Sequence, residues 1–138
     1  MKILICGRPN SGKTVLAKPF SELIGGVYLG EEEVNEHYQK YSGCHDFVSC
    51  GIGYKMLLLS DGIVRAGKIA VIDCVCEYQF ERDRIDPDFV VWMDTLKGDD
   101  LPFYTEPTKY NYHVSAWFDD THKQLMDVVT VWMQRNRE

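Results

Sequence analysis

Residues 1–14 are MKILICGRPNSGKT, and this stretch decides the fold. An apolar run over residues 3–6 ends at Gly7, and the chain from Gly7 to Thr14 fits the pattern G-x-x-x-x-G-K-[ST] at every position. This pattern is the Walker A motif, a phosphate-binding loop between a strand and a helix. Its glycines permit a backbone curl that directs successive N–H groups at phosphate oxygens. The stretch therefore predicts a strand, a nucleotide-binding loop and a helix, in that order.

The loop positions have expected roles in nucleotide binding. Lys13 would reach the outer phosphates, and the hydroxyl of Thr14 would hold Mg²⁺. The N-terminal end of the following helix adds unpaired N–H groups and a positive dipole end, both of which favour an anion. The alternative is a glycine-rich turn that binds no ligand. The nucleotide-binding residues predicted from the motif are Gly7, Arg8, Pro9, Asn10, Ser11, Gly12, Lys13 and Thr14.

Composition limits the class of protein. With 138 residues, 45% of them hydrophobic, the chain can form one domain (1–138) with a packed core. No apolar stretch is long enough to span a membrane, and the first strand begins so early that we expect no signal peptide. The net charge of −6 argues against nucleic acid as a bulk partner. The five cysteines, an odd number, indicate reduced thiols and a cytoplasmic location.

Predicted strands and helices alternate along the chain. The predicted strands are residues 2–6, 27–29, 68–73, 89–94 and 112–114. The predicted helices are residues 13–24, 31–41, 50–65, 78–85 and 119–135. Pro19 should bend the first helix or end its first half, because proline has no N–H to donate. The alternation predicts an α/β fold of the three-layer P-loop NTPase type, in which helices flank both faces of a parallel sheet.

Ligands of such sheets bind at the carboxyl ends of the strands. This rule places residues 7–14, 30–33, 73–77 and 94–97 around one crevice. Asp73 ends the apolar strand IAVID, where a carboxylate can hold Mg²⁺ directly or through water, as a Walker B acid does. The alternative is an ordinary strand-end acid that caps the next segment.

Three glutamates, Glu31, Glu32 and Glu33, follow the second predicted strand. A carboxylate there can accept the proton of an attacking hydroxyl, and we select Glu32 for this role. The alternative is a negatively charged first helical turn that complements the helix dipole. Arg82 and Arg84, in FERDR, could hold an anionic acceptor or the transferring phosphoryl group, or they could belong to a solvated helix face.

Other chemically interesting side chains have simpler interpretations. The cysteines match no common zinc spacing, so they are predicted to be ordinary thiols. Cys74 and Cys76 should lie on the same face of a strand end. Asp94 ends its strand as Asp73 does, but its neighbours also fit a turn. Aromatic side chains between residues 103 and 118 can stack on a base or cover the sheet edge.

These motifs and their order resemble the small P-loop kinases, and most closely the adenylylsulfate kinases (APS kinases). The resemblance covers residues 1–95 and rests on GRPNSGKT, VYLGEEEV, LLLSDGIVRAGKIAVID, FERDR and FVVWMDT. In that family the strand is followed by Leu-Asp-Gly-Asp-x-Val-Arg. Here Gly30, Glu32 and Asn35 replace the two Asp residues and the Arg that meets the acceptor. The family's long basic lid is shortened, and Lys97 is its single cationic residue.

The resemblance implies an ATP-dependent kinase that, with Mg²⁺, transfers the γ-phosphoryl group to a hydroxyl of a small anionic acceptor, with adenylylsulfate as the first choice. The adenine would lie near residues 105–114. A nucleoside or nucleotide kinase is one alternative. A nucleotide-binding ATPase or switch module without an acceptor is another, and the short lid favours it because a kinase must exclude water. The sequence leaves open whether two copies form a homodimer.

The proposed roles give a short set of site residues. The predicted catalytic residues are Lys13, Glu32, Asp73 and Arg82. The predicted Mg²⁺ ligands are Thr14 and Asp73.

Overall fold

The structure is a computed structural model that describes residues 1–41, 51–96 and 104–136. In this part of the chain, five parallel strands form one sheet in the order β2-β3-β1-β4-β5. The strands are β1 (Lys2–Gly7), β2 (Val27–Gly30), β3 (Ala70–Cys74), β4 (Phe89–Met93) and β5 (Tyr112–Val114). The helices are α1 (Lys13–Ile24), α2 (Glu31–Tyr41), α4 (Ile52–Arg65), α5 (Gln79–Ile85) and α6 (Thr121–Arg135). The predicted α/β fold is confirmed.

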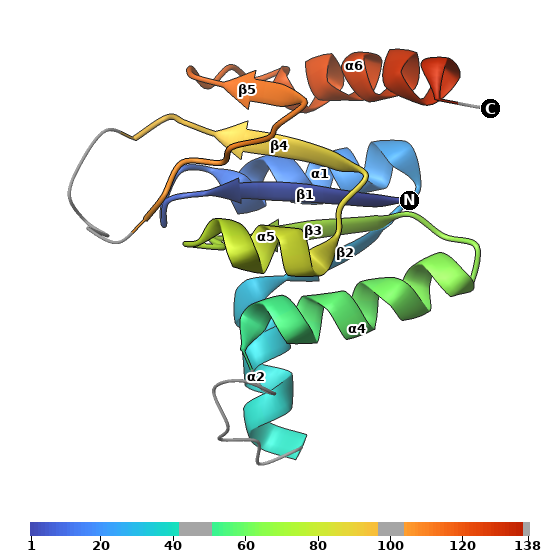
Figure 1. Cartoon of the computed structure of the whole chain (residues 1–138). Coiled ribbons are helices and arrows are strands. Elements are labelled where there is room, and N and C mark those ends of the chain that lie inside the picture. The colour runs from blue at the N-terminus through green and yellow to red at the C-terminus, as the bar shows by residue number, and fades with distance from the viewer. Residues whose placement is uncertain (42–50, 97–103, 137–138) are drawn as a thin grey trace.

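Strand β1 lies at the centre of the sheet, and all six of its residues are buried. Ile3 and Ile5 pack in one core cluster with residues of α1 and α6, whereas Leu4 and Cys6 pack in a second cluster with residues of α4 and α5. Figure 1 shows α1 behind the strands and α5 in front of them. Because helices cover both faces, the strand is apolar at consecutive positions rather than at alternate ones.

Helix α1 continues through Pro19 as one helix, so it does not end at the proline. The carbonyl that loses its partner belongs to Val15, which lies on the solvent side of the helix, where water can replace the missing hydrogen bond. The helix ends as predicted. Gly25 takes a left-handed conformation with φ 68°, and its N–H donates to the carbonyl of Glu22.

The other predicted elements occur within two residues of their predicted bounds. The largest shifts are at three starts, because β3 begins at Ala70, α4 at Ile52 and α6 at Thr121. Strand β5 is a parallel edge strand that pairs with β4.

The carboxyl ends of the strands meet at one edge of the sheet, on the left in Figure 1. The loop that follows β1, the start of α2 and the residues after β3 all lie at this edge. In the described ranges, no helix is long and apolar enough to cross a membrane.

Candidate functional site

The phosphate-binding loop joins β1 to α1 at the middle of this edge. At Gly7, a Cβ would lie 2.6 Å from the backbone oxygen of Met93 and 2.8 Å from Oγ of Ser11, so a larger residue would not fit. Asn10 (φ 64°) and Gly12 (φ 94°) both adopt left-handed backbone conformations, which asparagine and glycine tolerate best. The curl that the sequence pattern requires is therefore formed.

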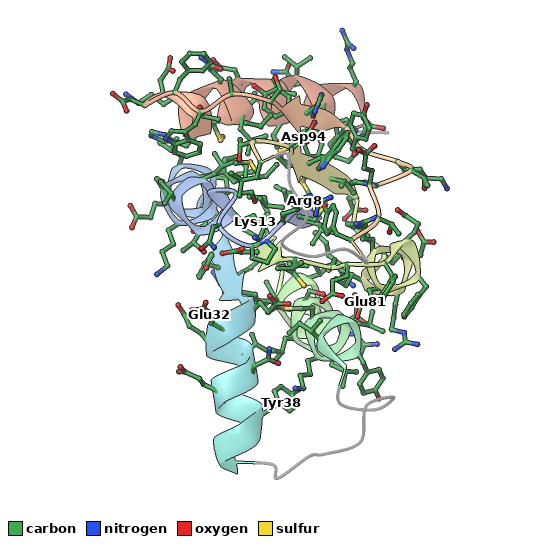
Figure 2. All side chains as sticks on the ribbon, turned by 90° about the vertical axis from the view of Figure 1, so that its left-hand side faces the viewer. Arg8, Lys13, Glu32, Tyr38, Glu81 and Asp94 are labelled. Atoms are coloured by element: carbon green, nitrogen blue, oxygen red, sulfur yellow. The ribbon has the colours of Figure 1, made fainter. Side chains whose placement is uncertain are left out.

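Lys13 lies at the wall of a cavity of about 560 Å³. Its side chain is 8% exposed, and its Nζ donates to the backbone oxygen of Arg8 at 2.9 Å. Figure 2 views the carboxyl edge, with Lys13 and Arg8 near its middle and Glu32 lower down on α2. The loop's own backbone thus holds the ammonium group beside the cavity.

The two predicted Mg²⁺ ligands are hydrogen-bonded to each other. Oγ1 of Thr14 donates to Oδ2 of Asp73 at 2.6 Å, and Asp73 is 4% exposed at the end of β3, next to β1. Hydroxyl and carboxylate oxygens are donors that Mg²⁺ prefers, and this ion usually takes one or two protein ligands besides phosphate and water. The pair therefore fits such an ion. Among the described residues, no group of three or more His, Cys, Asp or Glu side chains is arranged to hold a metal.

Tyr28, on β2, is a site residue that the sequence interpretation missed. Its hydroxyl donates to the same Oδ2 of Asp73 at 2.7 Å. Burial and this hydrogen bond raise the pKa of Tyr28, so its hydroxyl stays a proton donor. A Cβ on Gly30 would lie 2.6 Å from the Tyr28 hydroxyl oxygen, so the ring needs a glycine there. The sequence contained one indication of this contact: Tyr28 and Gly30 are two residues apart, and this spacing places both on one face of the strand.

The three glutamates at the start of α2 line the cavity but differ in environment. Glu31 is half-buried, and Sγ of Cys74 donates to its Oε1 at 3.6 Å. Burial raises the pKa of Glu31 above its ordinary value. Glu32 and Glu33 are exposed, and Oε1 of Glu33 lies 3.7 Å from Nζ of Lys18. Glu31, rather than the selected Glu32, thus directs its carboxylate toward β3.

Arg82 lies on α5 and is not among the residues that line this cavity. Its side chain is 2% exposed and donates to Oε1 of Gln79 at 3.0 Å and to the backbone oxygen of Thr105. Arg84 is exposed. The cavity brings together seven of the predicted site residues, namely Pro9, Asn10, Gly12, Lys13, Thr14, Glu32 and Asp73.

The guanidinium groups of Arg82 and Arg8 both lie over the ring of Tyr104. Cζ of Arg82 lies 5.3 Å from the ring centroid of Tyr104, and Cζ of Arg8 lies 4.9 Å from the same centroid. Close by, Oγ1 of Thr95 donates to the backbone oxygen of Ser11 at 2.7 Å. These contacts tie the loop to the segments that follow β4.

Asp94 is not among the residues that line the cavity beside Lys13. Its Oδ2 is 2.9 Å from Nε2 of His113, whose ring stacks on Trp92 with centroids 4.5 Å apart. Asp94 lines a separate cavity of about 50 Å³, so the expected crevice does not extend to it. Five residues considered from the sequence lie outside the described residues: Cys44, His45, Cys50, Lys97 and Phe103.

The described cysteines are free and buried. Cys74 and Cys76 lie on the same face as predicted, with their Sγ atoms 2.9 Å apart. Burial raises the pKa of Cys6 to about 12. The hydrogen bond with Cys76, together with burial, raises the pKa of Cys74 well above its ordinary value. These groups are therefore thiols rather than thiolates at neutral pH, and a thiol is a poor nucleophile.

Of the aromatic residues considered for base stacking, Trp117 lies beside the phosphate loop. A Cβ on Gly12 would be 3.8 Å from Cε3 of the Trp117 ring. Trp117 and its neighbour Phe118 are both exposed. A flat aromatic surface is thus available next to the loop.

No protein-family model and no curated protein matches the chain. Solved structures match it over nearly its whole length. The crystal structure of APE1195 has a TM-score of 0.76 at 15% identity and covers 95% of each chain. The APS kinase CysC of Mycobacterium tuberculosis, in complex with AMPPNP and APS, has a TM-score of 0.69 at 13% identity, covering 94% of this chain and 96% of that one. A sugar kinase from Janibacter has a TM-score of 0.66 at 16% identity, covering 96% and 94%.

At sequence identities of 13–16%, the similarity to these structures shows the fold alone. The chain has the fold of these small kinases, with a parallel five-stranded sheet between helices.

Proposed function

We propose that this protein is an ATP-dependent kinase that transfers the γ-phosphoryl group to a hydroxyl of a small molecule. The observation that carries the proposal is the meeting, at one cavity, of a complete Walker A loop, the Thr14–Asp73 pair and the carboxylates of α2. The fold shared with an APS kinase and a sugar kinase supports it. The free thiols fit the cytoplasmic location that we propose.

The phosphate side of the cavity would bind the nucleotide. Lys13 would offset the charge that develops on the phosphate oxygens, and Thr14 with Asp73 would hold Mg²⁺. The bound ion would offset the negative charge of the transferring phosphoryl group. Trp117 would stack on the purine, a contact that does not depend on the identity of the base.

The acceptor side would hold the hydroxyl and take its proton. Glu31 and Glu32 are the candidates for the base, and the structural observations favour Glu31. Its carboxylate is half-buried, and its raised pKa favours acceptance of a proton. The catalytic role of Arg82 stays a prediction. Its buried guanidinium, held by Gln79 and Thr105, favours a role in positioning the loop.

Adenylylsulfate is the acceptor that the sequence resemblance implies, and a nucleoside or nucleotide is the alternative. A panel of candidate acceptors with γ-labelled ATP distinguishes these kinases. Hydrolysis of ATP without transfer to any acceptor would instead support the ATPase or switch module.

The decisive variant is Lys13→Ala. We expect phosphoryl transfer to fall by about 10²–10³-fold or more, because the preorganised charge on the transferring group is lost. The circular dichroism spectrum should stay unchanged. Lys68→Ala is the matched control, since Lys68 is exposed and precedes β3 at the opposite edge of the sheet. Transfer by Lys13→Ala at the wild-type rate, or failure of the wild-type protein to bind ATP with Mg²⁺, would contradict the proposal.

A further inference from the structure

We infer that the acceptor of this kinase is a hydroxyl compound that carries an ammonium group. The inference rests on the proposed function and concerns the acceptor side of the same cavity, where α2 and β2 face the phosphate loop. It differs from the anionic acceptor that the sequence resemblance implies, and it depends on the charges and the aromatic surface that line the cavity.

Carboxylates outnumber cations around the cavity. The described carboxylates that line it are Glu31, Glu32, Glu33 and Asp73. The described cations that line it are Lys13 and Lys18. ATP with one Mg²⁺ bound still has a negative charge, so nucleotide binding would make the cavity more negative. An anionic acceptor would meet repulsion there, whereas a cation would be attracted.

The chain's own Lys18 shows how this wall can hold an ammonium group. Nζ of Lys18 lies 5.5 Å from the ring centroid of Tyr28 and 3.7 Å from Oε1 of Glu33. An aromatic face beside a carboxylate is a typical environment for an ammonium ion. The Lys18 side chain is 55% exposed, so it can move away and leave both partners to a ligand. The Tyr28 ring fits here because Gly30 has no side chain.

Other buried cations are engaged elsewhere. Lys55 on α4 donates to Oδ1 of Asn35 at 3.1 Å and lies 5.2 Å from the ring centroid of Tyr38. Neither Lys55 nor Arg82 is among the described residues that line the cavity. The described part of the site therefore has little with which to bind a second anion.

The test uses three sugars of similar size and different charge. They are glucosamine, glucose and glucuronate, assayed with γ-labelled ATP and Mg²⁺ at a pH where the amine of glucosamine is protonated. We expect transfer to glucosamine to be about tenfold faster than to glucose, and glucuronate to be the slowest. The expected factor reflects several partly exposed charge interactions, each of which is weak.

Binding of the same sugars is measured by calorimetry on the complex with Mg²⁺ and a non-hydrolysable ATP analogue. We expect glucosamine to bind about tenfold more tightly than glucuronate. Equal affinities, the reverse order or no binding of glucosamine would overturn the inference, whether or not transfer is seen. If the ATP analogue itself does not bind, the proposed function fails and the inference fails with it.

Two variants on α2 test whether Glu33 contributes to binding of the ammonium group. Glu33→Gln removes a carboxylate that lines the cavity, and we expect it to reduce the preference for glucosamine about threefold. Glu36→Gln is the control, because Glu36 is exposed on the same helix and is not among the lining residues. An equal change in both variants would indicate a general surface-charge effect, and an unchanged preference in Glu33→Gln would reject this contribution of Glu33.

Discussion

The phosphate side and the acceptor side of the cavity are built in different ways. On the phosphate side the backbone determines the geometry, because Gly7 fits tightly against Met93, and Asn10 and Gly12 have left-handed conformations. On the proposed acceptor side, side chains from β2 and α2 line the cavity, and tertiary contacts hold Glu31 and Tyr28 there. A backbone-determined site leaves a strict sequence pattern, whereas a site made of side chains can change residue by residue.

The two sides of the cavity differ in how closely they follow the kinase pattern. The phosphate loop fits its motif at every position, and it therefore supports ATP as the donor. The acceptor side departs from the kinase pattern at Gly30, Glu32 and Asn35. Because the resemblance implies acceptor contact for the Arg that Asn35 replaces, the sequence supports the proposed donor more strongly than the proposed acceptor.

The largest effect on the acceptor side is expected for Glu31→Gln. If Glu31 accepts the proton of the acceptor, transfer should fall by about 10²-fold or more, with nucleotide binding retained. Glu32→Gln is the matched control, and we expect its rate to change only a few-fold, because that side chain is exposed. The measurement is single-turnover transfer with saturating ATP. The opposite order of effects would restore Glu32 as the base.

The pH dependence gives a second test of Glu31. A general base must be deprotonated, so the rate should fall as pH decreases through the raised pKa of Glu31, above the pH range of an ordinary glutamate. A raised pKa in the folded state means that the protonated form contributes stability below the unfolded-state pKa, and this contribution is lost as pH rises through the folded-state pKa. Glu31→Gln should therefore remove the acidic limb without lowering Tm at neutral pH. An unchanged acidic limb in this variant would contradict the assignment.

On the phosphate side, Gly7→Ala tests the close approach of the backbone. The added Cβ would meet the backbone oxygen of Met93 at 2.6 Å, so we expect the free energy of unfolding to fall by about 1–3 kcal/mol. The control is Gly62→Ala on α4, where a Cβ meets nothing within 4 Å and the helix should gain up to about 1 kcal/mol. Urea unfolding measures both. Equal stabilities of the two variants would show that the loop relaxes around the new methyl group.

A smaller effect is expected for Tyr28→Phe. This substitution removes the hydroxyl that donates a hydrogen bond to Asp73 but keeps the ring. We expect kcat to fall a few-fold and more Mg²⁺ to be needed for half-maximal rate, because one hydrogen bond to a carboxylate contributes about 1–3 kcal/mol at most. A titration with Mg²⁺ at fixed ATP measures this. Phe80, exposed on α5, provides the control variant Phe80→Leu, and the same shift in both proteins would exclude a specific role of Tyr28.

Much of the fold could be predicted because it depends on local patterns. The Walker A motif, the apolar strands and the glycine at the end of α1 each act over a few residues, so the strands and helices occur close to their predicted bounds. Of the two predicted effects of Pro19, a bend or an end of the helix, the structure excludes the end, because the effect of a proline depends on where its lost hydrogen bond points. The sequence of that turn does not indicate that Val15 lies on the solvent side of the helix.

The sequence by itself determined the order of elements, the parallel sheet and a loop able to surround phosphates, since periodicity and glycine spacing restrict the backbone directly. Only the tertiary structure decided which glutamate turns inward, that Tyr28 shares Asp73 with Thr14, and that Arg82 is buried away from the cavity. These outcomes depend on contacts between residues far apart in the chain, whose burial and hydrogen bonds arise only when β2, β3 and α5 pack together.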